Sequence, residues 1–120
     1  MQKLAPVEEA KTLFNEAKDW GVWRWLTEKK RARRTADAAW EALEAHEKKV
    51  KAPRSAVLQL KELDKEAHQA RMDAEAQFDE ADRRMSAAMA CEGAAMALAA
   101  WEMREKYLRK LEALSRKSAV

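Results

Sequence analysis

Residues that break helices are almost absent from this chain, which has only two glycines and two prolines among 120 residues. Pro6 suits the first turn of a helix, where its missing N–H is not needed. The segment KAPRS, residues 51–55, resembles a turn, because Pro53 ends one helix and Ser55 can cap the next. We therefore predict a helix over residues 7–51, a turn at residues 52–54 and a second helix over residues 55–117.

The composition also argues against β-structure. Isoleucine is absent and valine and threonine are few, whereas strands are enriched in β-branched residues. Charged residues make up 38% of the chain, which fits long helices with narrow apolar stripes and solvated outer faces. We expect an all-α protein with a single helical domain over residues 1–120.

Apolar residues recur every three or four positions along both predicted helices, a spacing typical of coiled coils. A short connection makes neighbouring helices antiparallel, so a hairpin closing at Pro53 would pair positions whose numbers sum to roughly 106. The basic run KKRARR, residues 29–34, would then face the acidic part of the second helix. Because opposite flanking charges favour such pairing, we expect Arg33 to lie beside residues 73–82.

Two features of this hairpin require further packing. Gly21 destabilises a helix interior by about 1 kcal/mol, so an alternative has a short helix over residues 7–19 and a new one from Trp20. The second helix also extends past the first, which leaves residues such as Leu108 uncovered. The predicted fold is a long antiparallel helical hairpin with a short N-terminal helical segment. It forms a helical bundle by fold-back, at Gly21 or near Gly93, or by dimerisation, and we expect a homodimer.

The stretch WGVWRWL, residues 20–26, places three tryptophans within six positions. Its apolar arc on a helical wheel spans about 220°, whereas a surface helix needs only a little over ~100° to face its core. One partner helix cannot cover such an arc, and tryptophan is prominent among the residues that dominate binding energy. We predict a partner-binding surface that combines this turn with apolar residues of the second helix: Trp20, Trp23, Trp25, Leu26, Met89, Met96, Trp101 and Leu108.

Motifs for catalysis are missing: the sequence has no Gly-rich phosphate loop, no HExxH and no nucleophile–base motif. We expect His68 to form a surface polar pair with Asp64, His46 to be partly buried in the seam, and Cys91 to serve packing. Neither a cofactor nor a metal site is expected. We predict a non-enzymatic scaffold or protein-interaction module that self-associates or binds a helical protein partner.

Nucleic-acid binding is the alternative function. Basic residues could contact phosphates while nearby tryptophans stack on bases. A solvated face balanced by the acidic run is the preferred interpretation, because that run would also repel phosphate. The residues concerned are Arg24, Lys29, Lys30, Arg31, Arg33 and Arg34.

The expected location is the cytoplasm. One cysteine cannot form an internal disulfide, and the first residues lack the apolar core of a signal peptide. The Ala-rich stretch 85–101 is too short and too weakly hydrophobic to span a bilayer. The basic residues also follow the tryptophans as a block instead of sharing their turns, so we expect no membrane binding.

Overall fold

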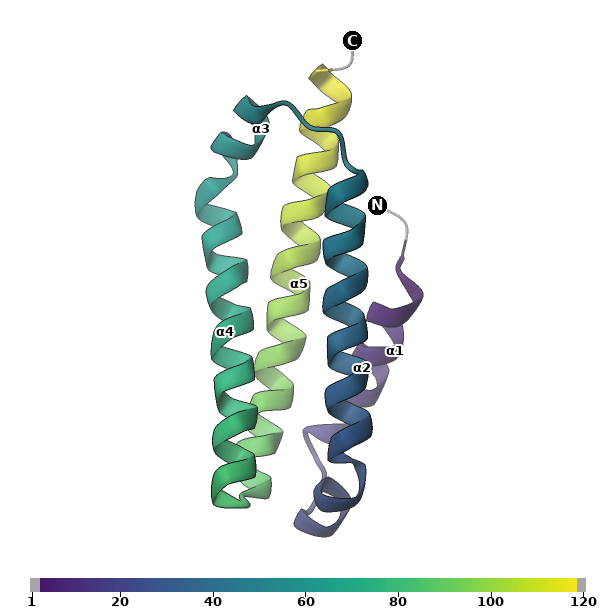
Figure 1. Ribbon diagram of the computed structural model, residues 1–120, viewed down its shortest axis with the longest axis vertical. Helices are drawn as coiled ribbons and strands as arrows, with labels where there is room; N and C mark the ends of the chain where they lie inside the picture. The colour runs from purple at the N-terminus through teal and green to yellow at the C-terminus, as the bar shows by residue number, and fades with distance from the viewer. Residues whose placement is uncertain (1–2, 119–120) are drawn as a thin grey trace.

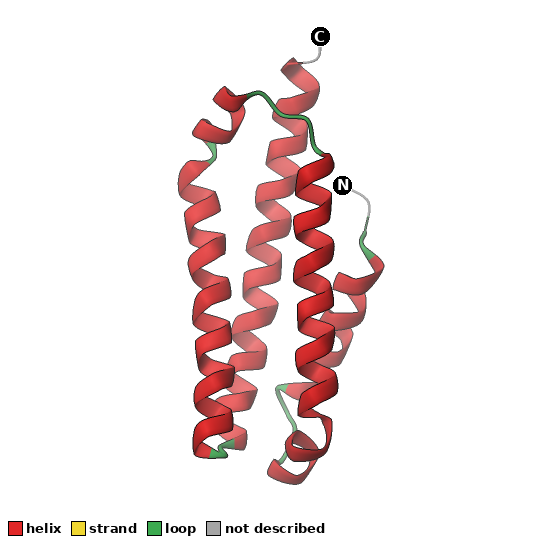
Figure 2. Cartoon of the chain, in the orientation of Figure 1, coloured by secondary structure: helices red, strands yellow, loops and turns green. Residues whose placement is uncertain are grey.

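The computed structural model describes residues 3–118 and contains helices but no strands in that range (Figure 2). The expectation of an all-α fold is confirmed. The helices are α1 (Ala5–Ala17), α2 (Val22–Lys49), α3 (Arg54–Gln59), α4 (Lys61–Arg84) and α5 (Ala87–Ser118).

The three long helices α2, α4 and α5 run side by side along the long axis of an elongated bundle, which measures 54 × 25 × 17 Å (Figure 1). Helix α5 is central, because it packs against α1, α2 and α4. The ammonium of Lys11 on α1 pairs with the buried carboxylate of Glu105 on α5. The short helix α3 lies at the end of the bundle opposite the α4–α5 connection (Figure 1).

The first predicted helix is divided at Gly21, as the alternative with a short N-terminal helix proposed. Gly21 has an extended backbone with φ −79° and ψ 175° and stands at the N-cap of α2. Pro6 occupies the first turn of α1, where a proline is tolerated.

The second predicted helix, residues 55–117, is not continuous, and this prediction is wrong. It is interrupted at Leu60, between α3 and α4, and it reverses at Met85, whose φ of 53° lies in the left-handed region. The N–H of Ser86 donates to the carbonyl of Ala81 over 3.0 Å, a 6→1 bond typical of a Schellman helix end. The Ser86 hydroxyl then accepts the N–H of Met89 over 3.2 Å, which caps the start of α5.

This reversal removes the reason for expecting a homodimer. Because α5 runs back along the other helices, Leu108 and Leu111 are buried within the same chain. The chain folds back at Met85, several residues before Gly93. Gly93 itself serves packing, because a Cβ there would lie 3.1 Å from Cδ1 of Phe78.

Arg33 on α2 lies beside the acidic part of α4, as the charge pattern predicted. Its guanidinium is 2.8 Å from Asp79 and 3.4 Å from Asp82. The register is displaced by roughly two helical turns from the predicted one, because residues 50–60 form an extended segment and α3 instead of a tight turn. Helix α4 packs mainly on α5, so a simple α2–α4 hairpin is not the closest pairing.

Aromatic rings from four helices form a continuous row in the core. Phe14 of α1 stacks on Trp101 of α5 with ring centroids 5.1 Å apart, and on Phe78 of α4 at 5.6 Å. Phe78 in turn stacks on Trp25 of α2 at 5.8 Å, and Trp40 of α2 meets Trp101 at 6.0 Å. These large rings fill the space between α2 and α4 and separate the two backbones.

Candidate functional site

The eight residues of the predicted partner-binding surface do not lie on one face. Trp25, Trp101 and Leu108 are fully buried and belong to the chain's own core. The physical reason for Trp101 and Leu108 is the reversal at Met85, which lays α5 along the other helices, whereas the ring of Trp25 stacks on Phe78 of α4. A partner cannot reach these three side chains in this fold.

The other five predicted residues remain accessible to different degrees. Trp23 is 80% exposed, the highest value among the large apolar residues that the structure leaves exposed. The rest are half-buried, and all but Leu26 pack against the core at its edge. These half-buried residues are Trp20, Leu26, Met89 and Met96.

Three of the exposed large apolar side chains, those of Val22, Trp23 and Met85, lie at one end of the bundle, and the others are on α3, α4 and α5. Val22 and Trp23 form the start of α2, and Met85 lies in the α4–α5 connection; the two segments are at the same end (Figure 1). Met85 is 65% exposed because its left-handed backbone places it outside both helices. Trp20, whose ring lies 6.5 Å from that of Trp25, links this region to the core. We call Trp20, Val22, Trp23 and Met85 the apolar end.

A basic depression lies on the neighbouring surface, between α2 and the last turn of α4. It has a volume of about 350 Å³, and its walls are mainly aliphatic carbons of the residues that line it, four basic residues of α2 and one acidic residue of α4. We call this feature the basic depression. The residues that line it are Lys29, Lys30, Arg33, Arg34 and Asp82.

The structure thus brings together four of the six basic residues that the sequence singled out. The other two have local partners instead. Arg24 lies over the ring of Trp20, 5.3 Å from its centroid, and Arg31 pairs with Glu28 at 3.2 Å. Within residues 3–118, Lys29, Lys30 and Arg34 have no carboxylate within 4.0 Å, so their charges face solvent.

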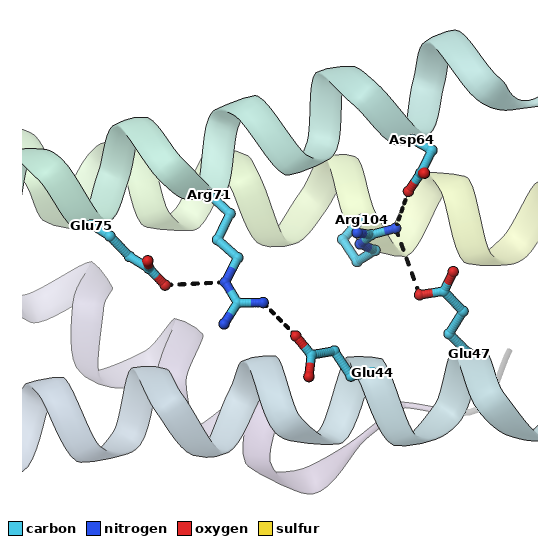
Figure 3. Close-up of polar contacts among 6 residues, drawn as sticks. All are labelled: Glu44, Glu47, Asp64, Arg71, Glu75 and Arg104. Atoms are coloured by element: carbon cyan, nitrogen blue, oxygen red, sulfur yellow. Dashed lines mark hydrogen bonds and ion pairs between the residues drawn. The ribbon is translucent and has the colours of Figure 1, made fainter.

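A polar seam joins α2 to α4 farther along the bundle, and sequence reasoning missed it. Arg71 of α4 pairs with Glu44 of α2 and lies 3.0 Å from Glu75 (Figure 3). Its guanidinium also covers the ring of Trp40 at 4.8 Å. Burial opposes the charge of Arg71, but the hydrogen bonds to Glu44 and Glu75 outweigh burial and raise its pKa.

Arg104 of α5, which passes behind α2 and α4 in Figure 3, lies in the same seam and reaches both helices. It lies 2.7 Å from Asp64 on α4 and 3.8 Å from Glu47 on α2 (Figure 3). Its guanidinium also lies 5.0 Å from the ring of Tyr107, whose pKa rises to about 12 because of burial and the nearby carboxylates of Glu47 and Asp64. The expected pair of Asp64 with His68 is replaced by this ion pair.

Two further residues behave largely as the sequence suggested. His46 is half-buried and pairs with Glu112 of α5. Burial opposes the charge of the Glu112 carboxylate, but its hydrogen-bonding and charged partners, His46 among them, outweigh burial and lower its pKa. The half-buried thiol of Cys91 donates to the carbonyl of Trp20 over 3.3 Å, and burial raises its pKa. A thiol with a raised pKa is a poor nucleophile.

The described residues contain no group of three or more histidine, cysteine, aspartate or glutamate side chains arranged to hold a metal ion. In the same range, none of the helices combines the length and apolar character needed to cross a membrane. Comparisons of the chain with protein-family models, with curated proteins and with solved structures find no match.

Proposed function

We propose that this protein is a non-enzymatic helical interaction module that docks a helical segment of a partner protein at its apolar end. The observation that carries the proposal is the 80% exposure of Trp23 at the start of α2. Tryptophan is enriched among the residues that dominate interface energy, and fully burying a large apolar side chain is worth about 1.5–3 kcal/mol.

The surroundings of Trp23 favour an amphipathic, acidic partner. Val22 adjoins Trp23 on α2, and Met85 in the α4–α5 connection is exposed at the same end of the bundle. Lys30 and Arg34 follow Trp23 at positions that share its face of α2, seven and eleven residues later. A helix with an apolar stripe flanked by carboxylates would meet both features, and charge complementarity would fix its orientation.

A partner of different sequence is favoured over a second copy of the chain. The exposed residues that motivated a homodimer, such as Leu108, are buried by the fold-back. The apolar end is also flanked by cations, which would repel one another if two copies met there symmetrically. Self-association through the apolar end would therefore contradict this proposal. A cytoplasmic location fits the proposal, since a single cysteine cannot form an internal disulfide.

Nucleic-acid binding is the second candidate, and the basic depression is the observation that favours it. Its cations extend over about 7.5 Å of helix, which covers few phosphates. Binding to a nucleic-acid duplex draws much of its affinity from many phosphate contacts, on the order of 6–10 in strongly salt-dependent binders. The acidic side chains of α4 beside the depression would also repel an extended polyanion, so a protein partner remains the first proposal.

The test uses the full chain and a designed helical peptide with a leucine stripe flanked by glutamates. We expect saturable binding in calorimetry, weakened about tenfold by Trp23→Ala. Leu58→Ala is the matched control, because Leu58 is also exposed but lies on α3 at the opposite end. Equal affinities for the two variants would overturn the proposal, as would a dimeric mass of the free chain that Trp23→Ala reduces to that of a monomer.

A further inference from the structure

The basic depression holds more positive charge than the protein itself neutralises. Four cations line it and one carboxylate, Asp82, faces them. Asp82 is only partly engaged, because its Oδ2 lies 3.4 Å from Arg33 whereas its buried Oδ1 has no hydrogen-bond partner among the described residues. Arg33 is also paired with Asp79. Three cations, Lys29, Lys30 and Arg34, are left without a carboxylate within residues 3–118.

The spacing of these cations is unfavourable for the free protein. Lys29 and Arg33, and likewise Lys30 and Arg34, are one turn apart on α2, and like charges at this spacing destabilise a helix. Asp79 and Asp82 relieve the first pair, but the second pair has no such relief. An anion bound between Lys30 and Arg34 would remove this repulsion.

The depression matches one compact anion better than a chain of anions. Its cations project from a single helical stretch about 7.5 Å long, and the flanking surface of α4 is acidic. A phosphate monoester carries nearly two negative charges and three acceptor oxygens, and arginine and lysine are its usual ligands. We infer that the basic depression binds one phosphate group, carried by the partner segment that docks at the apolar end. This inference rests on the proposed function.

The first experiment measures phosphate binding without any partner. Inorganic phosphate is added to the full chain at constant ionic strength, and the backbone amide signals of residues 29–34 are followed by nuclear magnetic resonance. We expect saturable shifts in this segment that Lys30→Gln/Arg34→Gln abolishes. The matched control is Lys48→Gln/Lys49→Gln, which removes the same charge from exposed positions at the other end of α2. Shifts that do not saturate, or that both double variants reduce equally, would overturn the inference.

The second experiment uses the designed acidic helix with one phosphoserine placed toward α2, or with serine at that position. We expect the phosphate to raise affinity about tenfold, and Lys30→Gln/Arg34→Gln to remove that gain, so that the phosphorylated and unphosphorylated peptides bind this variant with equal affinity. Equal affinities of the two peptides would overturn the phosphate inference and leave the proposed function intact. Phosphate shifts without binding of either peptide would instead overturn the proposed function and, with it, the claim that a docked partner segment carries the phosphate. A single-stranded oligonucleotide that binds more tightly than either peptide would overturn both.

Discussion

The guanidinium of Arg33 on α2 donates a hydrogen bond of 2.8 Å to the carboxylate of Asp79 on α4, across 46 residues of sequence. The same guanidinium lies over the ring of Phe78, 5.4 Å from its centroid. This contact closes the aromatic core on the side of the basic depression. It joins the basic part of α2 to the acidic part of α4, so these two segments lie side by side.

Arg33→Gln tests that contact. We expect the free energy of unfolding to fall by about 1 kcal/mol, because two ion pairs and a cation–π contact are lost at a half-buried site. Arg31→Gln is the control, since Arg31 is more exposed and pairs only with Glu28 on its own helix. Chemical denaturation measures both variants. If Arg31→Gln destabilised the protein as much as Arg33→Gln, the contact with α4 would have no special role.

Gly93→Leu tests the close approach of α5 to Phe78. A Cβ at residue 93 would lie 3.1 Å from a ring that is itself stacked between Phe14 and Trp25, so the ring has little room to move. We expect a loss of about 1–3 kcal/mol, the usual effect of overpacking. Ala95→Leu, two residues along the same helix but exposed, should leave stability nearly unchanged. Thermal unfolding that showed the two variants alike would contradict this packing.

Tyr107 is the sole tyrosine, so the ultraviolet absorbance of tyrosinate reports this group alone. We expect it to ionise near pH 12 in the folded chain and near pH 10 after unfolding. Because the folded pKa is the higher one, its contribution to stability is full below pH 10 and is lost as the pH rises toward 12. Between pH 10 and pH 12, the free energy of unfolding of Tyr107→Phe should therefore fall less than that of the parent chain. A midpoint near pH 10 in the folded chain would contradict the burial of Tyr107.

The tryptophans should differ sharply in their effect on stability. Trp101→Ala removes a fully buried ring from the centre of the aromatic row and should cost about 3–5 kcal/mol. Trp23→Ala should change stability by less than about 0.5 kcal/mol, because it removes an exposed side chain. Denaturant titrations of the two variants provide the comparison. Similar losses would mean that Trp23 also belongs to the core.

Some of this architecture was accessible from the residues alone. The scarcity of glycine, proline and isoleucine predicted helices, and the charge pattern predicted that Arg33 lies near Asp79 and Asp82. The reversal at Met85 was missed because a left-handed methionine has no strong signature, unlike glycine. Its one local signal was Ser86, a good N-cap residue, in the sequence RRMSAAM.

The candidate site was harder to predict than the fold, for a related reason. A helical wheel showed that residues 20–26 are apolar nearly all round, but it does not show which segment covers which side. The packing of the other helices decides that Trp25 is buried, where its ring stacks on Phe78 of α4, and that Trp23 is exposed. The basic run was visible in the sequence, whereas its division into paired and unpaired cations depends on the register of α4.

Oxidative footprinting of the five tryptophans reports whether the folded chain buries the core rings and leaves Trp23 exposed. We predict that brief exposure to hydroxyl radicals oxidises Trp23 first, while Trp25 and Trp101 stay protected until the chain unfolds. Rapid oxidation of Trp101, or protection of Trp23 equal to that of Trp25, would contradict the account.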